Sequence, residues 1–242
     1  MSTPGQRLRL ASHVRACHSD DQVILLDLRR NLYLGVGGPH LAALATAIDG
    51  WPSSCQAAVH VPVSAAEIAA LAKPLIAQGL LTDQPVDHEP KEVIGEATTS
   101  LNALDAVAHP TLGTRRFLRV LRSAASAALW LRCRSLLVTT QAVAARRARL
   151  GDDASRPPAP ATVSNAVAAY ERLRSLVYSA HGRCLHDSLA LVGFLAQEGI
   201  LARWVIGVQT RPFAAHSWVQ SGGLVLNDQH EHVRRFSPIV VV

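Results

Sequence analysis

The last quarter of the chain contains a cysteine, a histidine and an aspartate in the order that a thiol hydrolase requires: Cys184, His216 and Asp228. A thiol is a good nucleophile only as the thiolate, so it needs a base or a cation beside it. That base needs a third group that holds its tautomer and its orientation. We therefore predict Cys184 as nucleophile, His216 as base and then acid, and Asp228 as the residue that orients the imidazole.

The position of Cys184 in the sequence favours this chemistry. After Gly182, apolar residues recur at helical spacing until Gly199, so Cys184 falls at the start of a predicted helix. Amide dipoles at a helix N-terminus favour negative charge and lower the pKa of a thiol. The free backbone N–H groups there could also hold a developing oxyanion on a substrate carbonyl.

The other two residues fall on strands that a tight turn would pair. We predict strands over 202–208, 216–220 and 224–228, and a last strand over 236–242. Residues 221–223, Ser-Gly-Gly, form a hairpin turn between the second and third of these strands. Pairing through that turn would bring His216 and Asp228 close enough for a bridging hydrogen bond.

Other uses of these residues have to be weighed. A lone cysteine in an Ala- and Leu-rich chain is usually a small buried hydrophobe, and we expect this of Cys17, Cys55 and Cys133. His181, His186, His230 and His232 are rival histidines, and a metal site is conceivable from His181, Cys184, His186 and Asp187. Its spacing matches no common zinc pattern. Asp187 would raise the pKa of the thiol unless it is paired, and Arg183 is the candidate partner.

The composition limits which classes of protein this chain can belong to. The chain has 242 residues, 49% of them hydrophobic, which suits one large or two small folded domains. Basic residues outnumber acidic ones by 24 to 18, yet only Lys73 and Lys91 are lysines. The arginine-rich stretch around 115–149 contains only two aromatic residues, Phe117 and Trp130, so we expect no nucleic-acid partner. We also expect a reduced cytoplasmic protein with no secretion signal and no membrane span.

The first 80 residues combine short strands with helices. Residues 22–28 and 32–36 read as two strands around a turn at 29–31, and a helix follows over 40–48. Ser64 and Glu67 form a capping box for a further helix that contains Pro74 and ends at Gly79. This order is typical of a winged-helix domain and resembles the PqqD-like domains that clamp precursor peptides.

We therefore predict an α+β protein of two domains. A winged-helix (PqqD-like) recognition domain occupies 1–84, a linker 85–110, and a catalytic α+β domain 111–242. Residues 114–150 and 164–178 are predicted to be helical in the second domain.

Several motifs of the second domain together resemble the lasso-peptide B proteins. They are Arg183-Cys184-Leu185 with Ser188-Leu189-Ala190-Leu191, Ile206-Gly207-Val208, Phe213 with Ala215-His216 and Trp218-Val219, Leu226-Asn227-Asp228, and Ser237-Pro238-Ile239. The resemblance covers about residues 115 to 242. It implies a transglutaminase-like, papain-related fold and a cysteine peptidase that removes the leader from a ribosomally made precursor.

The resemblance also implies partners. The first domain would bind the precursor's leader as an added strand beside the 65–78 helix. The contact residues would be Leu32, Tyr33, Leu34, Gly35 and Val36, with Leu71 and Leu75 from the helix. An asparagine-synthetase-like cyclase would then close the macrolactam ring with ATP. The chain has no phosphate-binding glycine loop of the GxxxxGK[ST] kind, so we expect no cofactor on it, and any ATP requirement would enter through that partner.

Three other functions compete with this one. A transglutaminase or another acyltransferase would use the same triad but exclude water from the acyl-enzyme. A peptide-binding scaffold with a degenerate triad would need no Cys184. A winged-helix DNA-binding regulator ranks last, because the arginines cluster outside the first domain.

Overall fold

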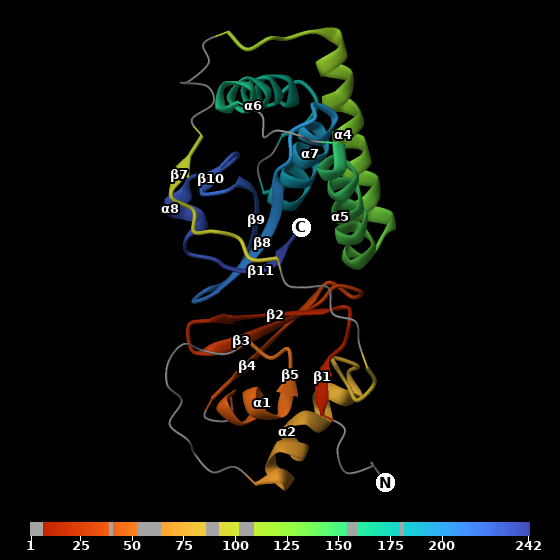
Figure 1. Cartoon of the computed structure of the whole chain (residues 1–242), viewed down its shortest axis with the longest axis vertical. Helices are drawn as coiled ribbons and strands as arrows, with labels where there is room; N and C mark the ends of the chain where they lie inside the picture. The colour runs from red at the N-terminus through yellow and green to blue at the C-terminus, as the bar shows by residue number, and fades with distance from the viewer. Residues whose placement is uncertain are drawn as a thin grey trace. The chain divides into compact units, whose positions relative to one another are not determined.

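The computed structural model describes residues 7–38, 41–52, 64–85, 92–101, 109–153, 159–179 and 182–242. The chain is a mixed α+β protein, as predicted, and it divides into two compact units (Figure 1). Unit 1 comprises Met1–Lys91 with Gln209–Phe213, and unit 2 comprises Glu92–Val208 with Ala214–Val242. Among the described helices, none has the length and apolar character needed to cross a membrane.

The described residues of unit 1 form two small sheets. The first is an antiparallel meander in the order β2-β3-β4, formed by β2 (Val14–Ser19), β3 (Gln22–Asp27) and β4 (Leu32–Gly37). The second has the order β5-β1-β6 and is formed by β1 (Leu8–Leu10), β5 (Ile48–Asp49) and β6 (Leu81–Thr82). The strands expected at 22–28 and 32–36 are therefore present, and β4 is an edge strand of its sheet.

The turn between β3 and β4 depends on one buried carboxylate. Asp27 is only 4% exposed, and its Oδ1 accepts hydrogen bonds from the backbone N–H groups of Arg29 at 2.8 Å and Arg30 at 3.2 Å. Asn31 then adopts a positive φ of 55°, a conformation that asparagine tolerates better than most residues. The turn predicted at 29–31 is confirmed.

In the described part of unit 1, helices α1 (Leu41–Ala47) and α2 (Ala65–Ala77) cover the core. The predicted capping box begins α2, with Ser64 N–H donating to Glu67 Oε2 at 2.8 Å and Glu67 N–H donating to Ser64 Oγ at 3.3 Å. Gly79 follows its end with φ of +73°, as expected for a residue just past a helix. Pro74 lies inside α2, which continues across it. The winged-helix assignment of this region stays a prediction.

Unit 2 is built on a five-stranded sheet in the order β11-β8-β9-β10-β7 (Figure 1). Its strands are β7 (Thr99–Ser100), β8 (Arg203–Thr210), β9 (Phe213–Ser221), β10 (Leu224–Val225) and β11 (Ser237–Val241). The hairpin between β9 and β10 turns at Gly222 and Gly223, as predicted. The third strand is shorter than expected, because the chain leaves the ladder after Val225.

The helices in the described part of unit 2 are α4 (Thr114–Cys133), α5 (Leu136–Asp153), α6 (Pro160–Arg174), α7 (Cys184–Gln197) and the short α8 (His230–Val233). Helix α7 lies next to β8 and β9, with α4 and α5 packed on α7 (Figure 1). Leu191, Phe194 and Leu195 of α7 are fully buried, so this helix is the centre of the unit's core.

Part of the expected 85–110 linker belongs to unit 2. The backbone N–H of Thr98 donates to Gly223 O at 2.9 Å, and Gln220 Nε2 donates to Gly95 O at 2.8 Å. Strand β7 then pairs in parallel with β10. A polar, proline-containing composition predicted a linker here, but the edge of β10 offers backbone partners that local composition does not reveal. Residues 102–108 lie outside the described part.

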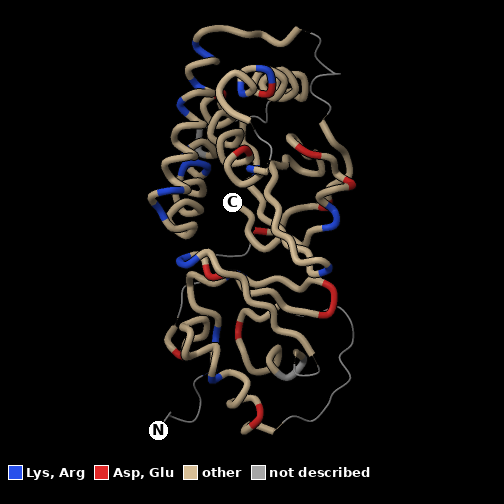
Figure 2. Tube along the Cα trace, turned by 180° about the vertical axis from the view of Figure 1, so that it is seen from behind, with Lys and Arg blue, Asp and Glu red and all other residues tan. Residues whose placement is uncertain are grey.

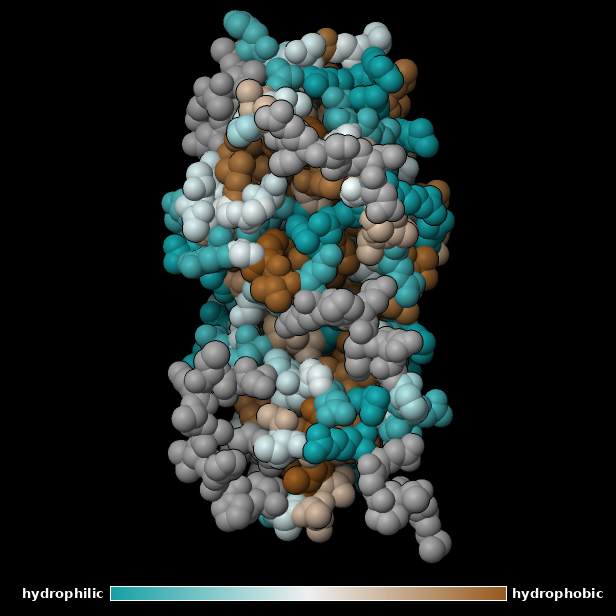
Figure 3. Space-filling model, in the orientation of Figure 1, coloured by the Kyte–Doolittle hydropathy of each residue, from teal (hydrophilic) through white to brown (hydrophobic). Residues whose placement is uncertain are grey.

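Arginines are concentrated on the helical side of unit 2. Blue segments follow α4 and α5, and few red ones lie beside them (Figure 2). Several large apolar side chains of these helices are also exposed, namely Leu118, Leu121, Leu129 and Val138. On the face drawn in Figure 3, hydrophobic surface likewise alternates with hydrophilic surface.

Candidate active site

Cys184 is the first residue of α7, as predicted. Gly182 precedes it with φ of +69°, a conformation that L side chains rarely adopt, and the chain then enters the helix through Arg183. No side chain caps this N-terminus, so its N–H groups are not taken by a capping residue. The backbone N–H groups of Leu185 and Ser217 donate to the Cys184 sulfur. The thiol therefore lies where positive dipoles converge.

His216 lies between the other two residues of the predicted triad. Its Nε2 is 2.5 Å from Asp228 Oδ2, and it also forms a hydrogen bond with the Cys184 thiol. An imidazole has two ring nitrogens, so the bond at Nε2 leaves Nδ1 for the sulfur. The structure thus brings together the three residues that sequence reasoning selected, and it gives the histidine two different partners.

Asp228 is held from several sides. Its Oδ1 accepts from the backbone N–H of Gln229 at 2.7 Å, while Oδ2 lies 2.5 Å from His216 and 3.0 Å from His232 Nδ1. Asp228 itself follows β10 rather than lying within it. The side chain of Asn227 replaces the next ladder bond, because its Oδ1 accepts from Val219 N–H at 2.8 Å. This exit from the strand aims Asp228 at the imidazole.

These contacts shift the protonation equilibria toward an ion pair. The hydrogen bond to His216 lowers the pKa of the Cys184 thiol, although burial opposes the shift. Burial would lower the pKa of His216, but its hydrogen bonds to Asp228 and Cys184 outweigh burial and raise the pKa to about 9. Burial likewise acts to raise the pKa of Asp228, and the bonds from His216, Gln229 and His232 hold it below its usual value. The shifts of Cys184 and His216 both favour a thiolate–imidazolium pair over the neutral thiol and imidazole, with Asp228 as the carboxylate beside it.

Aromatic rings enclose the imidazole. The His216 ring stacks on Trp218 with 6.1 Å between centroids, and the Phe236 ring lies 5.2 Å away. Trp218 in turn crosses the backbone of β8 at Gly207, where an added Cβ would come within 2.8 Å of the indole ring. A glycine is therefore required for this close approach. The rings shield one side of the ion pair from water.

A buried hydrogen-bonded cluster joins α7 to the sheet beneath the triad. The hydroxyl oxygens of Ser188 and Ser217 lie 2.7 Å apart, and the Trp204 indole N–H donates to both of them, at 2.9 and 2.8 Å. Ser188 also donates to Cys184 O at 2.7 Å, and Ser217 donates to Val205 O at 2.9 Å. Because Ser188 lies one helical turn after Cys184 and Ser217 adjoins His216, this cluster sets the distance between the thiol and the imidazole.

Asp187, the acid close to the nucleophile, has a different partner from the one expected. Arg174 Nη1 is 3.2 Å from its Oδ1, and Tyr178 OH donates to the same oxygen at 2.9 Å. The sequence-based partner was Arg183, its near neighbour, but α6 and the segment after it bring Arg174 and Tyr178 against the first turn of α7. The carboxylate is thus neutralised within the helical layer.

Sequence reasoning treated His232 only as a rival histidine. The short helix α8 returns it to Asp228, four residues earlier in the chain, where its ring also approaches His216 with centroids 4.8 Å apart. The i, i+4 spacing from Asp228 was the available signal. Among the described residues, His216, Asp228 and His232 are also the set whose ligand atoms could hold a metal ion, all within 4.8 Å of one another. The earlier metal candidate includes His181, which lies outside the described residues.

The predicted leader-contacting residues lie in unit 1. Leu32, Tyr33, Leu34, Gly35 and Val36 all belong to the edge strand β4, and Leu32 is 61% exposed. Leu71 is partly buried against the core, whereas Leu75 is only 5% exposed. Leu75 therefore supports the core beneath the strand, and its side chain is not available at the surface.

The fold and the site together define a class. A thiol at a helix N-terminus, paired with a histidine and an aspartate from an adjacent sheet, equips an α+β domain for thiol acyl chemistry. Residues 106–241 match the transglutaminase-like superfamily, which includes cysteine peptidases and acyltransferases, and the chain belongs to this superfamily.

One curated relative is similar over a shorter stretch. The microcin J25-processing protein McjB of Escherichia coli is 53% identical over 45 residues, which are 19% of this chain and 22% of McjB. The match therefore spans about a fifth of either protein. No solved structure matches the chain.

The ion pair predicts an unusually reactive thiol. At about pH 6, iodoacetamide should alkylate Cys184 faster than the exposed Cys133 of the same chain, because only thiolate reacts. Asp228→Asn should lower the pKa of His216 from about 9 and slow the reaction of Cys184 by roughly tenfold. Mass spectrometry of the two cysteine peptides over a pH series measures both rates.

Asp83→Asn, at an exposed acid of unit 1, is the control and should leave the rate unchanged. Because the pKa of His216 is raised from 6.5 to about 9, its contribution to stability is complete below about pH 6.5 and is lost as the pH rises through about 9. Equal alkylation of Cys184 and Cys133 at about pH 6 would show that the ion pair does not form.

The buried serine cluster predicts a stability effect. Ser217→Ala removes one acceptor from Trp204 and leaves Val205 O without its donor, so we expect a loss of about 1–3 kcal/mol in the free energy of unfolding. Ser175→Ala, which removes an exposed hydroxyl after α6, should cost less than about 0.5 kcal/mol. Urea unfolding of the full chain measures both, and equal losses would refute the role of the cluster.

Proposed function

We propose that this chain is the leader peptidase of a lasso-peptide pathway, which binds the leader of a ribosomally made precursor and cleaves it from the core. The observation that carries the proposal is the Cys184–His216–Asp228 arrangement, with the thiol at the start of α7 and the imidazole held by a carboxylate at 2.5 Å. Membership of the transglutaminase-like superfamily and the partial identity with a microcin-processing protein support it.

The chemistry follows from the protonation states of the site. The Cys184 thiolate attacks the carbonyl carbon of the scissile peptide bond, and the N–H groups at the start of α7 stabilise the developing oxyanion. The His216 imidazolium gives its proton to the leaving amine, which departs as the amino end of the core. Neutral His216 then takes a proton from water, and the resulting hydroxide attacks the thioester and releases the leader.

Asp228 serves both half-reactions. While its carboxylate holds Nε2, the other ring nitrogen stays directed at the sulfur and at the leaving group. The Asp228 carboxylate also stabilises the His216 imidazolium until the amine departs. The aromatic rings around His216 limit the water that reaches this pair.

The proposal assigns leader binding to β4. Within its own sheet, this edge strand pairs with another strand on one side only. Its exposed Leu32 offers an apolar contact. An extended leader that adds to it would gain main-chain hydrogen bonds without specific side-chain matching at each position. An asparagine-synthetase-like cyclase would use the released core, with ATP entering at that later step.

Cleavage is tested with a lasso-type precursor peptide, with and without the cyclase and ATP. Wild-type protein should produce leader and core whose summed mass exceeds that of the precursor by one water. Cys184→Ala should lower the rate by at least about 10³-fold, because the nucleophile is lost. Cys133→Ala should cleave like wild type, since Cys133 is exposed on α4. Mass spectrometry follows the products.

Each outcome has a defined reading. Equal cleavage by Cys184→Ala and wild type would refute the assignment of the nucleophile. A product in which leader is joined to an added amine, with no gain of water, would instead make the protein an acyltransferase. Cleavage that occurs only with the cyclase present would place the activity in a complex.

Leader binding is tested by hydrogen exchange on the Cys184→Ala chain, which holds the precursor uncleaved. The amides of β4, Leu32–Gly37, should exchange more slowly when the precursor is bound, because an added strand gives them new partners. The other edge strand of the same sheet, β2, is the internal control and should not change. Protection of β2 alone, or of both edges alike, would contradict the proposed site.

A further inference from the structure

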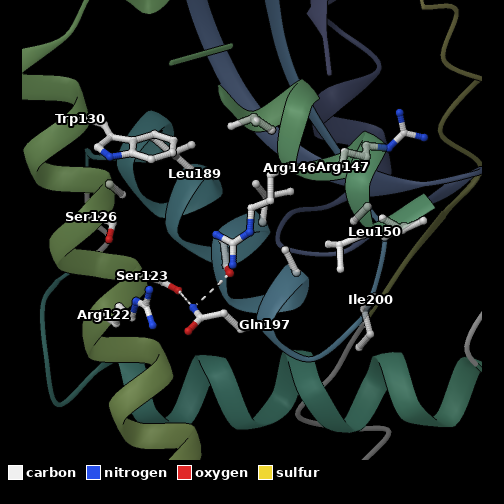
Figure 4. A pocket seen from close by; sticks show the side chains of 17 residues that line it. Arg122, Ser123, Ser126, Trp130, Arg146, Arg147, Leu150, Leu189, Gln197 and Ile200 are labelled. Carbon is white, nitrogen blue, oxygen red and sulfur yellow. Dashed lines mark hydrogen bonds between the residues drawn. The ribbon is translucent and has the colours of Figure 1, made fainter. Parts of the chain in front are cut away.

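Unit 2 contains a cavity of about 200 Å³ between α4, α5 and α7, and its lining includes none of the triad residues (Figure 4). Much of its wall is apolar, with Trp130 from α4, Val143 and Leu150 from α5, and Leu189 and Val192 from α7. Ser123 and Gln197 supply polar groups at one side, where Gln197 Nε2 donates to Ser123 Oγ at 2.6 Å. The cavity is thus an apolar space with a polar end.

Three arginines line the cavity, and two of them, Arg122 and Arg146, lie near these polar groups. Figure 4 shows Arg146 reaching from α5 into the middle of the cavity, while Arg122 lies on α4 beside Ser123. Arg146 Nη1 would be 3.9 Å from a Cβ placed on Gly193, so it lies directly over the α7 backbone. Burial and the nearby charge of Arg122 both lower the pKa of Arg146. Both side chains remain exposed to solvent, so two like charges lie near each other beside the cavity where an anion can reach them.

The nearby acids whose side chains the structure describes are paired with other arginines. Glu198 is paired with Arg116 and Arg119, and Glu92 with Arg147 and Arg203. Among the described side chains, no carboxylate pairs with Arg122 or Arg146. Adjacent cations without a counter-charge repel each other, and an anion bound between them would relieve this repulsion.

We propose that this cavity binds a small organic carboxylate whose apolar body lies against Trp130 and Leu189 and whose carboxylate lies between Arg122 and Arg146. The volume of the cavity limits the size of the ligand, because an apolar cavity of about 150 Å³ holds a benzene ring. The present cavity, at about 200 Å³, therefore has room for a ring or branched chain with a short acidic arm. The site is separate from the proposed peptidase chemistry and stands whether or not that proposal is correct.

The probe is 3-phenylpropanoate, and its uncharged match is 3-phenylpropanamide. Isothermal titration calorimetry on the full chain should show saturable binding of the acid and at least about tenfold weaker binding of the amide, because the charge-assisted bonds are lost. Arg146→Gln should weaken binding of the acid by about tenfold or more. Arg149→Gln, at an exposed arginine of the same helix that does not line the cavity, should change it by less than about twofold.

The variants also carry a check on folding. Since Arg146 is near Arg122 and has no acidic partner among the described side chains, Arg146→Gln should melt at the same temperature as wild type or higher. N-Acetylphenylalanine and its amide form a second probe pair. Tighter binding of this acid than of 3-phenylpropanoate would identify the natural ligand as a peptide's C-terminal end, and the reverse order as a free acid.

Three results would overturn the proposal. The first is equal affinity for acid and amide, which would remove the role of the carboxylate. The second is an equal loss of affinity for the acid in Arg146→Gln and Arg149→Gln, which would show that binding depends on net charge alone. The third is the absence of saturable binding of either acid up to about 10 mM, a limit set by the weakest specific affinities.

Discussion

The contact between α7 and the sheet through Ser188, Ser217 and Trp204 is the constraint on which the active-site geometry depends. Each hydroxyl lies close to a member of the predicted triad, Ser188 one turn beyond Cys184 and Ser217 directly after His216. A net contribution of about 0.5–1.5 kcal/mol per bond is modest, but a buried donor left without a partner costs more. The cluster therefore favours one register of helix against sheet, and that register places the thiol beside the imidazole.

The electrostatics of the site follow from this register. The thiol meets the N–H groups at the start of α7 and the imidazole of β9, and both stabilise its anion. The imidazolium is stabilised in turn by Asp228, which the exit of the chain from β10 turns toward it. Asp187 is close in sequence to the thiol, yet Arg174 and Tyr178 take up its charge. Positive and negative groups are thus sorted so that the thiolate remains the favoured anion beside His216.

The helical layer of unit 2 shows a second pattern of charge. Most of its described acids form ion pairs with arginines. Arg122 and Arg146 lie beside a cavity and have no acidic partner among the described side chains. Both side chains are exposed, yet two guanidinium groups that lie near each other repel, and an anion between them would relieve that repulsion. The same core helix, α7, therefore forms one wall of the proposed ligand cavity and carries Cys184 at its N-terminus.

The sequence by itself determined the features that depend on neighbouring residues. The capping box of Ser64 and Glu67, the turn at 29–31 and the start of α7 at Cys184 could be predicted, because capping and turn formation involve residues only a few positions apart. Cys184, His216 and Asp228 could be selected from residue type and order. Only the tertiary structure decided that His232 returns to Asp228, that Arg174 rather than Arg183 pairs with Asp187, and that Thr99–Ser100 joins the sheet. These outcomes depend on distances between segments far apart in the chain, and such distances are set by the packing of α7 on the sheet and not by local periodicity.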